Sequence, residues 1–78
     1  MAKPLPYDEV IRRLKKHDSG FQEFKRRGKG SHRMITHENC GGQKKSFPLK
    51  HHGKKTEIQR GSLRALIRQF NLPSNIFD

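Results

Sequence analysis

A helical spacing of apolar residues opens the chain. The residues that recur at this spacing are Tyr7, Val10, Ile11 and Leu14. They predict an amphipathic helix from Tyr7 to about His17, with acidic residues in its first turn and basic residues in its last. Gly20 lies just beyond this helix as a stop signal, and residues 1–6, which contain two prolines, are expected to form an extended lead.

A second helical stripe lies near the C-terminus. Its apolar positions are Leu63, Leu66, Ile67 and Phe70. We expect Gly61 and Ser62 to open this helix, with Ser62 as the N-cap, and Asn71 and Pro73 to end it. The tail beyond Pro73 would then add a short turn that packs Phe77.

Between the two helices the pattern changes to short strands separated by glycines and basic loops. The predicted strands are 21–27, 31–36 and 43–50. A loop or hairpin connection over residues 38–42 joins the second strand to the third, and Pro48 indicates that the third strand lies at an edge or contains a bulge. The order α-β-β-β-α predicts an α+β fold in which two helices cover one face of a three-stranded antiparallel sheet.

Composition limits the size and the partners of this fold. With 78 residues, of which 29% are hydrophobic, the chain 1–78 is expected to be one small domain with a thin core. Its 18 Lys and Arg residues against 7 Asp and Glu give a net charge of +11, which favours nucleic acid as a partner. A single cysteine and the lack of a long apolar run predict a cytoplasmic protein with no membrane partner.

Three blocks of the sequence resemble the HicA family of toxin-antitoxin ribonucleases. These blocks are EVIRRLKKHDSGF, RRGKGSHR and PLKHHGKKTEIQRGSLRALIRQFNL, and the resemblance runs from about Tyr7 to Phe77. It implies a fold like that of double-stranded-RNA-binding domains and a metal-independent endoribonuclease without a cofactor. Such a toxin cuts mRNA and blocks translation and growth until a HicB-type antitoxin neutralises it. We expect the free toxin to be a monomer that forms a higher-order complex with the antitoxin.

The family signature, a Gly-Ser-His triplet after the first strand, matches Gly30-Ser31-His32. The resemblance therefore implies that His32 is the catalytic general acid/base. Histidine suits this role because its ordinary pKa of about 6.5 lies close to working pH. The family often has a second histidine directly after this one, where this chain has Arg33. His51 and His52 are candidates for a second acid/base, although neighbours in an extended segment point opposite ways.

Basic residues and the glycine-rich turn are expected to hold the RNA phosphates. The expected RNA-binding residues are Lys29, Gly30, Ser31, Arg33, Lys44, Lys45, Lys54, Lys55 and Arg60. Several of them lie in the turn before His32 or in the loop before the last helix, where double-stranded-RNA-binding domains contact phosphates.

Three other interpretations are possible at this point. A metal site formed by His37, Cys40 and the His51-His52 pair is disfavoured, because structural zinc sites normally use two spaced pairs of ligands. We therefore expect no metal. A non-catalytic RNA-binding module with the same fold is the main alternative, and a DNA-binding accessory protein has only the generic positive charge in its favour.

Overall fold

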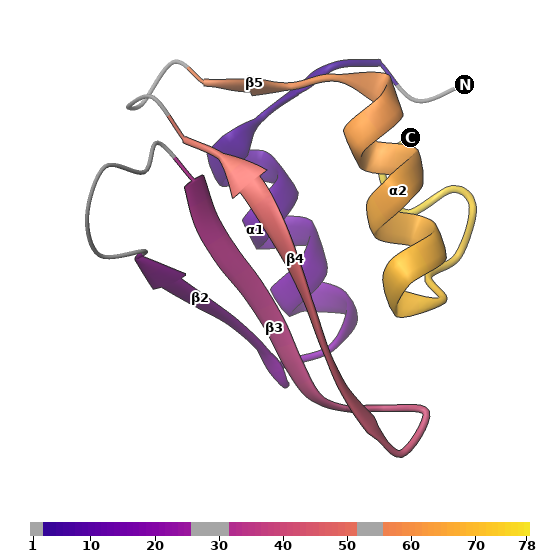
Figure 1. Ribbon diagram of the computed structural model, residues 1–78. Helices are drawn as coiled ribbons and strands as arrows, with labels where there is room; N and C mark the ends of the chain where they lie inside the picture. The colour runs from indigo at the N-terminus through magenta and orange to yellow at the C-terminus, as the bar shows by residue number, and fades with distance from the viewer. Residues whose placement is uncertain (1–2, 26–31, 52–55) are drawn as a thin grey trace.

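The computed structural model describes residues 3–25, 32–51 and 56–78, and Figure 1 shows how their helices and strands are arranged. The elements are β1 (Leu5–Pro6), α1 (Tyr7–His17), β2 (Phe21–Lys25), β3 (His32–Cys40), β4 (Gln43–Lys50), β5 (Glu57–Ile58) and α2 (Arg60–Phe70). The predicted α+β fold is confirmed, because β2, β3 and β4 form a three-stranded antiparallel sheet between the two helices in the chain order.

The three-stranded sheet has β3 at its centre, with β2 on one side and β4 on the other. Pro48 lies in β4 opposite Met34, so its missing N–H falls on an edge strand, as the sequence predicted. Both helices lie on one side of this sheet in Figure 1. The sheet therefore has a helix face, which is covered, and an open face, which is turned away from the helices.

The core lies between the helix face of the sheet and the two helices. Val10 and Leu14 of α1 and Leu63, Leu66 and Phe70 of α2 are almost fully buried there, as their helical spacing predicted. The sheet contributes Phe21, Ile35 and Leu49. Phe77 also joins this core from a turn after Pro73, which confirms the predicted packing of the tail.

The β3–β4 hairpin is longer than its sequence suggested. The predicted hairpin connection is confirmed but is shorter than residues 38–42, because β3 continues to Cys40 and only Gly41 and Gly42 form the turn. Both glycines have positive φ, 65° and 85°, which is what a two-residue hairpin turn of this hand requires. A register shift between His37 and Cys40 allows the strand to continue past the residues that looked like a loop.

The start of α2 also differs from its prediction. The helix begins at Arg60 with Gln59 as its N-cap, so Ser62 lies in the first turn and is not the N-cap. The reason is the short strand β5, which pairs with β1 and brings the chain into the helix earlier. The backbone N–H of Tyr7 donates to the carbonyl of Thr56, which ties the start of α1 to this same region. No helix in the described parts of the chain is long and apolar enough to cross a membrane.

Candidate active site

His32 is the first residue of β3 and lies on the open face of the sheet. Side chains alternate along a strand, and Arg33, the next residue, points to the helix face. In the sheet register His32 is opposite Lys50 of β4. A histidine and a lysine thus lie side by side at the end of the open face, which is a suitable pair for an anionic ligand.

A hollow of about 270 Å³ extends from this pair across the edge of β4. The residues that line it are His32, Phe47, Pro48, Lys50, Glu57, Ile58, Gln59 and Ser62. It is bounded on one side by the first turn of α2, which contains no acidic residue and no side-chain cap hydrogen bond among the described residues. Because backbone N–H groups at a helix N-terminus attract anions, the imidazole, the ammonium group and the helix end together favour a phosphate here.

Arg33 and His51 belong to a cluster on the helix face. The hydroxyl of Tyr7 donates to Glu23 Oε2, and Arg33 Nη1 donates to the same oxygen at 2.9 Å. The guanidinium lies 5.6 Å from the centre of the Tyr7 ring, and the His51 ring packs edge-on against that ring at 4.5 Å. The structure therefore does not bring either residue to the open face beside His32.

This cluster shifts the pKa of its acidic members in opposite directions. Burial raises the pKa of Tyr7 well above its usual value, and the hydrogen bond to Glu23 raises it further. Burial also raises the pKa of Glu23, but the hydrogen bonds from Tyr7 and Arg33 outweigh burial and lower that pKa below its usual value. The phenol and the carboxylate are therefore held in their neutral and charged forms respectively.

The other expected RNA-binding residues fall in two places. Lys44 and Lys45 lie near the Gly41–Gly42 end of the hairpin, where Lys45 is opposite His37 and Lys44 lies 3.9 Å from Glu38. That end is five residues along β3 from His32, or about 17 Å at the usual rise of a strand. Arg60 is the first residue of α2, near the hollow. The residues that lie outside the described parts are Lys29, Gly30, Ser31, His52, Lys54 and Lys55.

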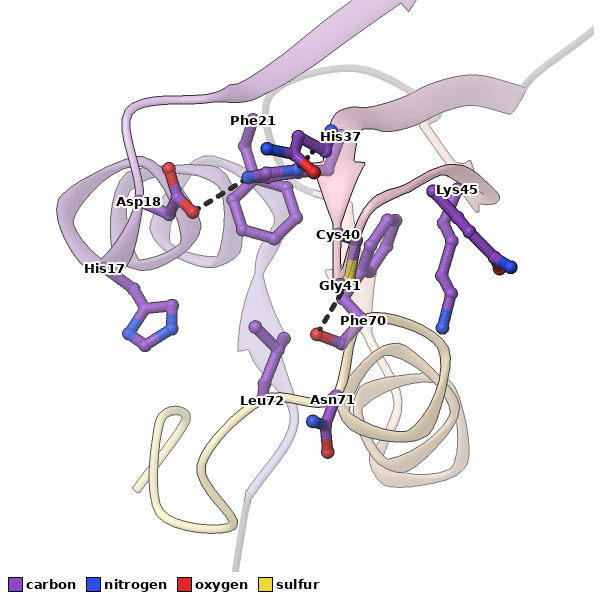
Figure 2. Close-up of a pocket in the computed structure, with 12 residues that line it drawn as sticks. His17, Asp18, Phe21, His37, Cys40, Gly41, Lys45, Phe70, Asn71 and Leu72 are labelled. Carbon is purple, nitrogen blue, oxygen red and sulfur yellow. Dashed lines mark hydrogen bonds and ion pairs between the residues drawn. The ribbon is translucent and has the colours of Figure 1, made fainter.

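A second pocket, of about 420 Å³, lies at the hairpin end between the C-termini of α1 and α2 (Figure 2). In it, His37 Nε2 is 2.8 Å from Asp18 Oδ2, and the backbone N–H of Asn39 donates to His37 Nδ1. Cys40 Sγ donates to the carbonyl of Phe70 at 3.2 Å. Both ring nitrogens of His37 are thus engaged in holding the fold, and in the described parts of the chain no three His, Cys, Asp or Glu side chains group around a metal-sized space.

Several residues that line the hollow were not predicted from the sequence. Lys50 and Glu57 are the charged residues that line it with His32, and Gln59 is the N-cap of α2. Only the strand register reveals that Lys50, and not Lys44 or Lys45, is opposite His32. The alternation of Leu49 and Lys50 was a usable signal, since it places Lys50 on the open face once Leu49 is assigned to the core.

Comparison with models of known protein families gives a match over most of the chain. Residues 7–72 match a family model described as the HicA toxin of bacterial toxin-antitoxin systems. The chain belongs to the HicA toxin family. As a HicA toxin it is the toxin of a toxin-antitoxin system, and the family implies a cognate antitoxin. No match is found among curated proteins or among solved structures.

Proposed function

We propose that this HicA toxin is a metal-independent endoribonuclease that cuts mRNA and is neutralised by a HicB-type antitoxin. The observation that carries the proposal is the hollow in which His32 and Lys50 lie beside the N-terminal turn of α2. A proton-transferring group and a set of phosphate-binding groups are what strand cleavage of RNA needs at one place.

The proposed reaction uses the RNA's own 2′-hydroxyl. The imidazole of His32 takes the proton of that hydroxyl, and the oxygen attacks the adjacent phosphorus, so that the O2′–P bond forms and the P–O5′ bond breaks. The departing 5′-oxygen takes up a proton, and the product is a cyclic phosphate. Lys50 and the N–H groups of α2 would stabilise the extra negative charge of the phosphorane. Solvent water would supply the proton for the leaving oxygen.

The positive charge of the toxin would attract both RNA and the antitoxin. A net charge of +11 attracts RNA, and phosphate contacts by Lys29, Lys54, Lys55 and Arg60 would give binding a steep salt dependence. The same field attracts an acidic antitoxin. An antitoxin seated over the hollow would block RNA and the N-terminus of α2 together, so that one contact suffices for inhibition.

Cleavage of a defined single-stranded RNA in EDTA tests the proposal, with the parent protein compared with His32→Ala. His17→Ala is the matched control, because His17 is an exposed histidine at the C-terminal end of α1 and does not line the hollow that contains His32. Binding of the same RNA is measured in parallel. We expect His32→Ala to bind RNA but to lose about 10²- to 10⁴-fold in cleavage rate, and His17→Ala to cut like the parent.

Two results would overturn this assignment. Equal cleavage by the parent and His32→Ala would remove His32 as the catalyst and direct attention to Glu57, His51 and His52. Binding without cleavage by the parent itself would make the chain a non-catalytic RNA-binding module.

A further inference from the structure

The open face of the sheet has one aromatic ring that the core does not use. Phe24 is 50% exposed, whereas Phe21, the other phenylalanine of β2, is 5% exposed in the core. Alternation along β2 explains the contrast, since Phe21 and Glu23 point to the helix face and Phe24 points to the open face. Among the described residues no other large hydrophobic side chain is exposed to this degree.

Phe24 does not stand alone on that face. In the sheet register it is opposite Met34, and Met34 is opposite Pro48, so an apolar row crosses all three strands. The next row toward the end of the sheet on the same face is His32 and Lys50. Phe24 is therefore a diagonal neighbour of His32, at the roughly 7–8 Å that separates such positions in antiparallel strands.

We propose that the apolar row of Phe24, Met34 and Pro48 is a stacking platform for a base of single-stranded RNA next to the scissile phosphate. This inference rests on the proposed function, because it extends the site at His32. A flat, exposed aromatic ring is the group on which unpaired bases stack, whatever their sequence. The adjacent His32–Lys50 row and the +11 charge favour a polyanion over an apolar partner on this face. A duplex would keep its bases in the helix, so the platform selects single-stranded RNA.

The test measures RNA affinity separately from cleavage. All variants are made in the His32→Ala background, so that the RNA stays intact, and bind a fluorescein-labelled single strand of about ten nucleotides. Phe24→Ala and Phe24→Leu should both weaken binding by about 5- to 150-fold, the usual effect of losing one base–aromatic stack. Phe24→Tyr keeps the ring and should bind like its parent in this assay, the His32→Ala protein with Phe24 unchanged. Gln22→Ala is the matched control, since Gln22 lies on the same face of β2, one row further from His32.

A second readout reports stacking directly. A 2-aminopurine base is moved along the same RNA, and its fluorescence should be quenched at one position by the parent and by Phe24→Tyr, but not by Phe24→Leu. Far-ultraviolet circular dichroism checks that each variant is folded.

The outcomes separate this inference from the proposed function. Equal affinity of Phe24→Leu and the parent, with no quenched position, would overturn the platform even if His32 proves catalytic. Loss of affinity on Phe24→Leu, when His32→Ala still cuts, would leave the platform standing without the proposed catalyst. A Phe24→Leu variant that changes the sedimentation of the free protein but not its RNA affinity would assign the row to a second copy of the chain and overturn the inference.

Discussion

Substitution of Glu23 by Ala should be among the most damaging single changes at a polar residue of this small fold. One oxygen of this carboxylate accepts hydrogen bonds from both Tyr7 and Arg33. Tyr7 is 1% exposed in the intact protein, so its hydroxyl depends on this carboxylate for its hydrogen bond. The side chains of Glu23 and Arg33 are 22% and 24% exposed, so solvent can partly replace their ion pair.

The expected magnitude follows from these exposures. A buried hydroxyl left without a partner costs about 1–3 kcal/mol, and the hydrogen bonds of a charged acceptor add to this. Because Arg33 regains some water, we expect Glu23→Ala to lower the free energy of unfolding by about 2–4 kcal/mol. A chain of this length is stable by only about 4–12 kcal/mol, so the loss is a large part of the whole. Glu23→Gln keeps an acceptor for Tyr7 and should cost less.

Urea unfolding followed by circular dichroism measures this loss. Glu38→Ala is the matched control, because Glu38 is also a strand carboxylate near a lysine, but both side chains are more than 60% exposed. Its effect should be close to zero. If Glu23→Ala were no more damaging than Glu38→Ala, the carboxylate would not stabilise the fold through its hydrogen bond to the Tyr7 hydroxyl.

The stabilisation by the Glu23 carboxylate depends on pH, and the sign of this dependence follows from the pKa shift of Glu23. The pKa of Glu23 is lowered in the folded protein, so its charge contributes stability above the unfolded pKa of about 4.3. That contribution is lost as the pH falls through the lowered folded pKa. The difference between the parent and Glu23→Gln should therefore narrow below about pH 4. A difference that stays constant down to the acid transition would contradict a charged, hydrogen-bonded Glu23.

Two further predictions concern the ionisation of Tyr7 and the space around Gly20. Tyr7 is the chain's one tyrosine, so tyrosinate absorbance reports its ionisation alone. Its raised pKa predicts no tyrosinate in the folded protein at about pH 11, one unit above the usual pKa of about 10, whereas the denatured protein titrates there. The stabilising effect of the neutral phenol is complete below the unfolded pKa of about 10 and is lost as the pH rises from there through the folded pKa, and normal titration of the folded protein would refute this. A Cβ on Gly20 would lie 2.9 Å from His37 Nε2, so Gly20→Ala should destabilise the protein by about 1–3 kcal/mol in urea unfolding. Gly61→Ala meets nothing within 4 Å in α2 and should be neutral or stabilising, and equal effects of the two changes would refute the steric argument.

The helices and the sheet order could be predicted because each depends on local patterns. The stripes of α1 and α2 are long enough to identify the buried face of each helix, and Pro48 identified an edge strand through a missing donor. The strand β5 could not be predicted, since two residues carry no periodicity of their own. Its pairing with β1 is a long-range contact, and it moved the start of α2 from Ser62 to Arg60.

The candidate site was only partly predictable for a similar reason. The position of His32 came from the resemblance, but its neighbours depend on the register of β3 against β4. Sequence reasoning named Lys44 and Lys45, but not Lys50, among the RNA-binding residues, whereas the register places Lys50 opposite His32. The partnership of Tyr7 with Glu23 joins residues 16 positions apart on different elements, and nothing in the spacing of either residue indicates it.

The two adjacent residues at the start of β3 point to opposite faces of the sheet. His32 lies on the open face, and Arg33 lies on the helix face, bonded to Glu23 and stacked on Tyr7. A second histidine in place of Arg33 would therefore point away from His32, because neighbours in a strand alternate. The departure from the family pattern at this position leaves the open face unchanged, and Arg33 instead anchors the strand that carries His32. A second acid/base beside His32 would therefore have to come from another segment of the chain and not from the residue that follows it.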